Sequence, residues 1–92
     1  MQDYDVLQAA VDHYGSDRQI DKAIEEMSEL TKALLKLRYD ANEQTVENVF
    51  EEMADVEIML DQLKLIIGDK AIYRCDKVYR LTEKLHEEGV TV

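Results

Sequence analysis

The scarcity of helix-breaking residues is the feature that most constrains the fold of this chain. Its 92 residues include no proline and only three glycines, Gly15, Gly68 and Gly89. Proline and glycine are the residues least compatible with a helix interior, so long helices are predicted between these glycines and the polar stretch 40–45. The sequence therefore predicts one all-α domain, residues 1–92, with helices over about 2–13, 17–40, 45–67 and 69–88.

Two of the predicted helices begin at residues typical of helix caps. Ser16 followed three residues later by Gln19 matches a capping box, in which a hydroxyl and an amide each satisfy a free backbone N–H. This pattern predicts that the second helix starts near residue 17. Thr45 is the predicted cap of the third helix.

The third predicted helix is apolar on more than one side. One apolar stripe at helical spacing comprises Val46, Val49, Phe50, Met53, Val56, Leu60, Leu63 and Ile67. Four further apolar residues lie outside this stripe: Ile58, Met59, Leu65 and Ile66. Two-sided burial in so small a chain predicts a helical-bundle homo-oligomer, a dimer or a tetramer. Glu57 and Lys64 fall in the phase of the stripe and are either an interface polar pair or the end of a stripe that turns away from the core.

The net charge of the chain disfavours some classes of ligand and favours others. Eleven basic against 21 acidic residues give −10, which argues against binding to nucleic acid or anionic membranes and favours a multivalent cation. The single cysteine, Cys75, cannot form an internal disulfide, and no run of apolar residues is long enough to span a membrane. Together with the absence of a leader pattern, these features predict a cytoplasmic protein.

The charge is also segregated along the chain. Residues 1–69 contain 6 basic and 17 acidic groups, whereas residues 70–92 contain 5 basic and 4 acidic groups. At helical spacing the basic residues of the last segment share one edge, which comprises Lys70, Arg74, Lys77, Arg80 and Lys84. An acidic body is thus followed by a helix with a cationic edge.

A paired acidic motif lies in the second and third predicted helices. Glu26 and Glu29 form an ExxE motif, and Glu52 and Asp55 form an ExxD motif 26 residues later in matching helical phase. If the two helices pack antiparallel, the four carboxylates can converge at the edge of the groove between them. An all-oxygen site of this kind suits Mg²⁺, with Mn²⁺ as a possible substitute.

A solvated acidic surface is the alternative interpretation of these motifs. With 21 acidic residues, about four to five acidic pairs at i,i+3 spacing are expected by chance. Lys22 and Lys32 can offset the charge of the second helix, but no basic residue lies at i±3 or i±4 from Glu52 or Asp55. The repulsion in the third helix therefore calls for compensation from outside it, by a metal ion or by the cationic edge.

The motif and its setting resemble a known family. The pattern begins with Gln19 and Lys22 and continues through the ExxE motif. After 22 residues the ExxD motif follows, with its neighbours Glu51, Ala54 and Val56. This arrangement is similar to MazG-like members of the all-α nucleoside triphosphate pyrophosphohydrolases. The likeness extends over about residues 8–86. It implies Mg²⁺-dependent hydrolysis of a nucleoside or deoxynucleoside triphosphate to the monophosphate and pyrophosphate, with the metal held by Glu26, Glu29, Glu52 and Asp55.

The resemblance also implies roles for residues around the acidic motif. Glu25 becomes a candidate for orienting the attacking water, although it could equally be a surface glutamate. Candidates for substrate binding are Gln19 and Lys22 on the second helix and Lys77 and Arg80 on the last. The chain has no tryptophan and one phenylalanine, so base stacking would fall to Phe50 or a tyrosine.

Two other classes of function remain open at this stage. A noncatalytic helical interaction module would use the surplus apolar surface of the third helix to bind a partner protein. A redox protein with two carboxylate-bridged metals is suggested by Glu83 and His86, but it would need a second ExxH motif, which the sequence lacks.

Overall fold

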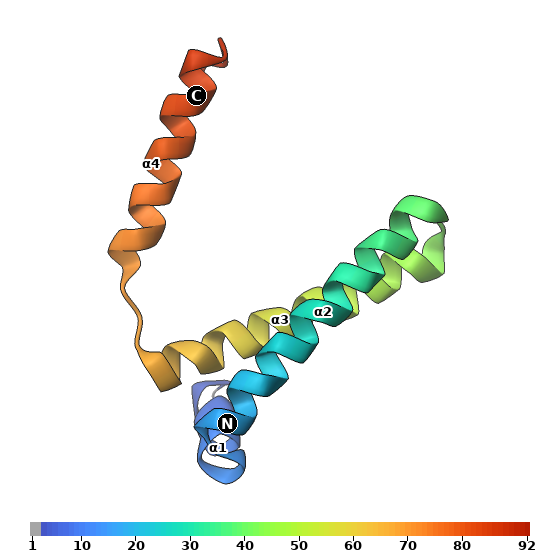
Figure 1. Ribbon diagram of the computed structural model, residues 1–92, viewed down its shortest axis with the longest axis vertical. Coiled ribbons are helices and arrows are strands. Elements are labelled where there is room, and N and C mark those ends of the chain that lie inside the picture. Colours follow the sequence, from blue (N-terminus) through green and yellow to red (C-terminus); the bar gives the residue numbers. More distant parts are fainter. Residues whose placement is uncertain (1–2) are drawn as a thin grey trace.

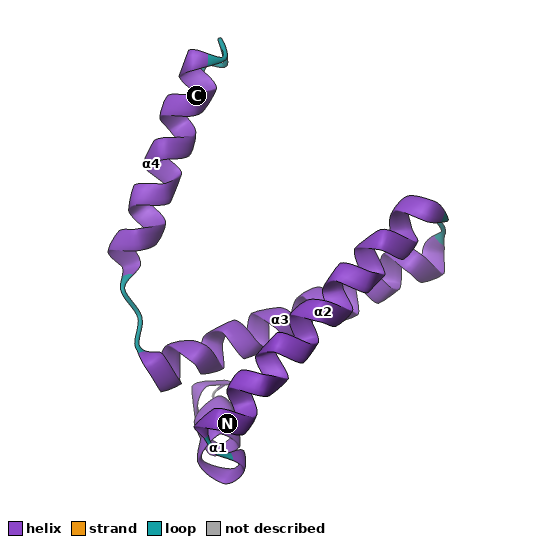
Figure 2. Cartoon of the chain, viewed as in Figure 1, coloured by secondary structure: helices purple, strands orange, loops and turns teal. Residues whose placement is uncertain are grey.

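The computed structural model describes residues 3–92, which form four α-helices and no strand (Figures 1 and 2). The helices are α1 (Asp3–Tyr14), α2 (Ser16–Tyr39), α3 (Glu43–Ile67) and α4 (Ala71–Glu87). The all-α prediction is confirmed, and the predicted bounds differ from these by at most two residues; the predicted start at residue 2 lies outside the described residues. No helix within residues 3–92 combines the length and apolar character needed to cross a bilayer.

Helices α2 and α3 form a long antiparallel hairpin around which the rest of the molecule is arranged (Figure 1). Its buried positions follow a spacing of three and four residues: Gln19, Ala23, Glu26 and Ala33 on α2, and Val49, Met59 and Gln62 on α3. Alanine at two of these positions leaves room for close approach of the helices. Polar residues occupy three of the remaining positions, so the seam of this hairpin is not purely apolar.

The side of α3 that packs on α2 coincides only in part with the predicted stripe. Met59, which lies outside the predicted stripe, is 5% exposed, whereas Phe50 and Ile67 within the stripe are 59% and 75% exposed. The packing line passes through Val49 and Val56 of the predicted stripe and through Glu52 and Met59 outside it, and a glutamate in this line makes it difficult to recognise from hydrophobicity. Of the four apolar residues predicted outside the stripe, Met59 is buried, Leu65 and Ile66 are half-buried and Ile58 is exposed.

The helix caps also differ from those predicted. Helix α2 follows Gly15, whose φ of 92° lies in the left-handed region, and no side chain caps its first turn, so the predicted capping box at Ser16 and Gln19 is wrong. At α3 the capping residue is Asn42, and Thr45 is the third helical residue. Asn42 accepts from the Thr45 N–H at 3.0 Å and the Thr45 hydroxyl accepts from the Asn42 N–H at 2.9 Å.

The two shorter helices relate differently to the hairpin. Helix α1 packs against both α2 and α3 and buries Val11 there, whereas α4 contacts none of the other helices and buries no residue. Gly68, with a φ of 117°, ends α3, and α4 then extends away from the hairpin (Figure 1). One chain thus consists of a three-helix body and a projecting helix.

Candidate functional site

Three carboxylates from α2 and α3 meet near the middle of the hairpin. Glu26, Glu52 and Asp55 each have one carboxylate oxygen that lies within 4.8 Å of those of the other two residues. Glu26 and Glu52 occupy buried-seam positions of the two antiparallel helices, and Asp55 lies about one turn beyond Glu52. Three of the four predicted metal ligands are therefore brought together. Their oxygen atoms could hold a hard divalent cation such as Mg²⁺ or Mn²⁺.

Glu26 and Glu52 are partly withdrawn from solvent, whereas Asp55 is exposed, so part of the cluster's charge lies in an unfavourable environment. Glu26 is 9% exposed, and the Glu52 Oε2 atom is shielded from solvent without a hydrogen-bond partner among the described residues. Burial, followed by the nearby charges of Asp55 and Glu26, raises the pKa of the Glu52 carboxyl above its ordinary value of 4.5. The negative charge at Glu52 is thus destabilised unless a proton or a cation accompanies it.

Glu29, the fourth predicted ligand, lies at the margin of the cluster. It is not one of the three converging carboxylates, and it pairs with Lys32 at 3.3 Å on the surface of α2. Its charge nevertheless contributes to the raised pKa of Glu52. To become a ligand, the Glu29 side chain would have to leave Lys32 and turn toward the cluster.

Lys22 is the cation that lies beside the cluster. Its Nζ atom is 3.2 Å from a Glu26 oxygen and 3.6 Å from a Glu25 oxygen, and these partners raise the pKa of Lys22 above 10.5. The Glu25 side chain is 61% exposed and lies on the Lys22 side, outside the three-carboxylate cluster. Lys22 therefore connects the candidate water-orienting residue with a candidate metal ligand.

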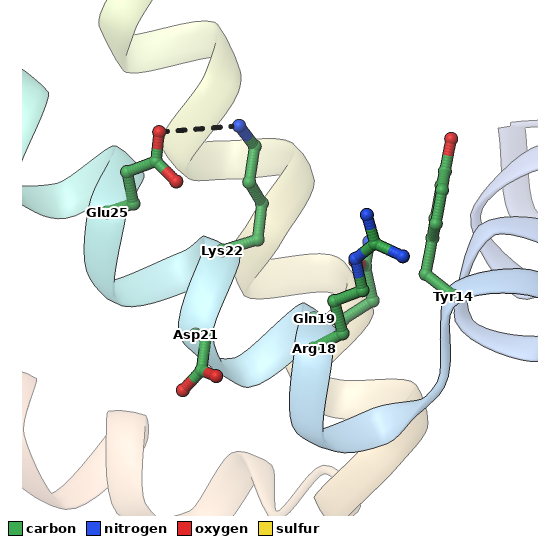
Figure 3. A pocket seen from close by; sticks show the side chains of 6 residues that line it. All are labelled: Tyr14, Arg18, Gln19, Asp21, Lys22 and Glu25. Atoms are coloured by element: carbon green, nitrogen blue, oxygen red, sulfur yellow. Dashed lines mark ion pairs between the residues drawn. The ribbon is translucent and has the colours of Figure 1, made fainter.

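An open groove begins at the end of α1 and continues along α2 to Lys22 and Glu25 (Figure 3). Its other lining residues include Tyr14 and Arg18, whose guanidinium lies 5.3 Å from the centre of the Tyr14 ring. Neither residue was predicted for this site from the sequence. Arg18 stands one helical turn before Lys22, which was a usable signal, whereas no local spacing indicates Tyr14.

Gln19 lines the same groove, but its amide is engaged within the protein. Its Nε2 atom donates to Gln62 Oε1 at 2.8 Å, and the Gln62 amide in turn lies 3.7 Å from the Met59 sulfur. Both glutamines are buried, at 6% and 4% exposed. Gln19 therefore ties α2 to α3 below the groove.

Comparison of this chain with protein-family models, with curated proteins and with solved structures finds no match. Any assignment of function therefore rests on the cluster, on the groove and on the motif resemblance described above.

Lys77 and Arg80, the remaining predicted substrate-binding residues, lie away from the cluster. Both are exposed on α4, which does not contact the hairpin in the same chain. Arg80 pairs with Asp76 one turn earlier, at 3.1 Å. A single chain therefore brings the acidic cluster and the α2 side of the groove together and leaves the cationic edge of α4 apart.

Proposed function

We propose that this protein is a Mg²⁺-dependent nucleotide pyrophosphohydrolase of the MazG-like type, acting on a nucleoside or deoxynucleoside triphosphate. The observation that carries the proposal is the shielded, unpartnered Glu52 oxygen within a cluster that includes Glu26 and Asp55. Like charges held this close are expected to disfavour the metal-free state, and a divalent cation would relieve both the repulsion and the missing coordination. Mn²⁺ is expected to substitute for Mg²⁺ at an all-oxygen site.

The reaction adds water across the bond between the α- and β-phosphates and yields the monophosphate and pyrophosphate. A bound divalent cation would supply charge neutralisation at phosphate and a lowered pKa for water. Glu26, Glu52 and Asp55 would hold that cation, with Glu29 as the fourth ligand after a rotamer change. Glu25 is the candidate acceptor of the water proton, since it lies beside the cluster and remains accessible to solvent.

The groove along α2 suits the remainder of the substrate. Lys22 and Arg18 carry positive charge toward a phosphate chain, and the Tyr14 ring offers a face for base stacking. Gln19 would act by fixing the wall of the groove through Gln62, and Lys77 and Arg80 could meet phosphate only from the α4 of another copy. A cytoplasmic location is part of the proposal because Cys75 is an exposed free thiol, as is usual in a reducing compartment.

The proposal is tested by incubating the protein with a panel of ribo- and deoxyribonucleoside triphosphates and Mg²⁺ and measuring pyrophosphate. At least one nucleotide should be hydrolysed, and Glu52→Gln and Asp55→Asn should each lower the rate by at least about 100-fold, since even supporting residues of metal sites are worth 10–100-fold. Glu47→Gln on the same helix is the matched control and should retain full activity. Absence of product with every nucleotide, or full activity of both cluster variants, would contradict the proposed pyrophosphohydrolase activity at this cluster.

A noncatalytic interaction module remains a second candidate because the hairpin exposes a large apolar face, including Ile24 and Phe50. That function needs no metal. Thermal unfolding with and without Mg²⁺ separates the two, because a cation bound only by the folded state raises the melting temperature. A melting temperature that Mg²⁺ leaves unchanged would favour the interaction module.

A further inference from the structure

A buried pair of amides lies beneath the groove along α2. Gln19 on α2 and Gln62 on α3 are 6% and 4% exposed, and Gln19 Nε2 donates to Gln62 Oε1 at 2.8 Å. Packing of the hairpin does not require amides at these positions, because apolar side chains would fill the seam without the cost of desolvating polar groups. The pair is therefore a candidate for a role beyond packing.

The sulfur of Met59 sets the direction of this hydrogen bond. Gln62 Nε2 lies 3.7 Å from Met59 Sδ, and a thioether sulfur can accept a hydrogen bond but cannot donate one. The nitrogen of the Gln62 amide is thus turned to Met59, and its oxygen is turned to Gln19. Since an amide oxygen only accepts, Gln19 has to turn its own nitrogen toward Gln62.

The direction of the bond determines which atom Gln19 can present to a ligand. Gln19 lines the groove of Figure 3, and its nitrogen is engaged with α3. Its Oε1 atom accepts from no group within residues 3–92 and is not shielded from solvent as Glu52 Oε2 is. Gln19 is therefore a fixed hydrogen-bond acceptor at the groove, whereas an unrestrained glutamine could rotate its amide to donate or to accept.

The position of Gln19 along α2 corresponds to that of the base in a bound nucleotide. Gln19 precedes Glu26 by seven residues, which places both on the same face of the helix, about 10 Å apart along its axis. With the phosphates at the carboxylate cluster, a nucleoside extended along α2 brings the edge of its base to this level. The groove has a volume of about 450 Å³, which suits a small-molecule ligand.

We propose that Gln62 is a positioning residue for base selection, which fixes the Gln19 oxygen toward the groove and makes the site prefer bases that carry an exocyclic amino group. This inference rests on the proposed function, which places the phosphates at the carboxylate cluster. The amino group of cytosine or adenine donates to a fixed acceptor, whereas the oxo group of uracil or hypoxanthine sets two acceptors against each other. The mismatched oxygen atoms would then remain unpaired, which lowers affinity.

Equilibrium binding of nonhydrolysable analogues tests this preference independently of catalysis. The full chain is titrated calorimetrically in the presence of Mg²⁺ with the α,β-methylene analogues of CTP, UTP, ATP and ITP, in ribo and deoxyribo form. Wild type should bind at least one amino analogue about tenfold or more tightly than its oxo counterpart. Gln62→Met removes the acceptor while retaining side-chain length, and should bring this ratio to within about threefold of one because Gln19 is then free to rotate.

Two further variants separate the orientation of Gln19 from packing. Gln62→Glu keeps an oxygen acceptor in front of Gln19 and should retain the wild-type ratio to within about threefold. Gln44→Met replaces an exposed glutamine of the same helix, whose amide bonds to Asn48, and should bind all analogues as wild type does. Each ratio compares two ligands on one variant, so a loss of stability common to both cancels.

Several outcomes would overturn base selection by Gln62: no binding of any analogue, equal affinity within both pairs, tighter binding of the oxo members, or an amino preference that survives in Gln62→Met. Pyrophosphate release from the corresponding natural triphosphates is measured alongside. An amino preference in binding without pyrophosphate release would refute the proposed hydrolysis and leave base selection standing. Hydrolysis without that preference would refute base selection alone.

Discussion

At the scale of single residues, Glu52 is the most informative position in the molecule. It belongs to the packing seam, where an apolar residue would be expected, and yet it carries a carboxylate with one shielded, unpartnered oxygen. Such a residue costs stability in the metal-free protein. A bound cation, as proposed above, would offset this cost.

The raised pKa of Glu52 predicts a specific pH dependence of stability. Between its ordinary pKa of 4.5 and the higher value in the folded protein, the folded state binds more protons than the unfolded state. The free energy of unfolding contributed by Glu52 therefore falls as pH rises through this window and is constant above it. Thermal unfolding of the metal-free protein should show that Glu52→Gln removes this decline and melts above wild type at neutral pH.

The matched control for that measurement is Glu47→Gln, an exposed glutamate of the same helix that should keep the wild-type pH profile. Added Mg²⁺ should raise the melting temperature of wild type more than that of Glu52→Gln. An unchanged pH profile in Glu52→Gln would show that the carboxyl is not strained in the folded protein.

The carboxylate cluster was partly predictable from the sequence at this scale. The ExxE and ExxD spacing was sufficient to predict that Glu26, Glu52 and Asp55 converge, because helical phase is readable from residue numbers. It could not predict that Glu29 pairs with Lys32 or that Gln19 is bonded to Gln62, because side-chain rotamers and long-range partners are not encoded in local spacing. Arg18 and Tyr14 were missed for a related reason, since their juxtaposition depends on the turn at Gly15.

At the scale of secondary structure elements, the helix starts show how capping signals can mislead. Ser16 and Gln19 match a capping box in sequence, but Gly15 precedes the helix and the Gln19 amide is bonded to α3 instead. At α3 the reciprocal bonds involve Asn42 and Thr45, a threonine where the usual motif has glutamate or glutamine. Local patterns therefore predicted where helices begin to within two residues and did not identify which side chains cap them.

This difference leads to a pair of predicted substitution effects. Asn42→Ala should lower the free energy of unfolding by about 1 kcal/mol, the usual loss for an N-cap side chain, because the Thr45 N–H loses its partner. Ser16→Ala should change it by less than about 0.5 kcal/mol, as is typical of surface substitutions without such a role. Urea unfolding of the two variants gives both values, and a larger loss for Ser16→Ala would restore the original capping assignment.

At the scale of the whole molecule, the separation of α4 from the body is the main departure from a simple bundle. The composition predicted four helices, and four are present, but the amphipathic pattern of α4 did not indicate which surface it would contact. A 17-residue helix without tertiary contacts is marginally stable in water. Its order in solution should then depend on a neighbour outside its own chain.

Hydrogen exchange measures the stability of α4. Backbone amides of α4 should exchange at least about 100-fold faster than those in the middle of α2 and α3, because local opening of an uncontacted helix requires little free energy. Equal protection of α4 and the hairpin would mean that α4 packs on the body or on a neighbouring molecule.

The projection of α4 also gives the molecule a ready attachment point for spectroscopic probes. Cys75, the single cysteine of the sequence, is exposed on this helix. A maleimide fluorophore or nitroxide would therefore label each chain at one position, without cysteine removal and without disturbing the carboxylate cluster. In a two-copy assembly, the distance between the two labels would report directly how the projecting helices are oriented.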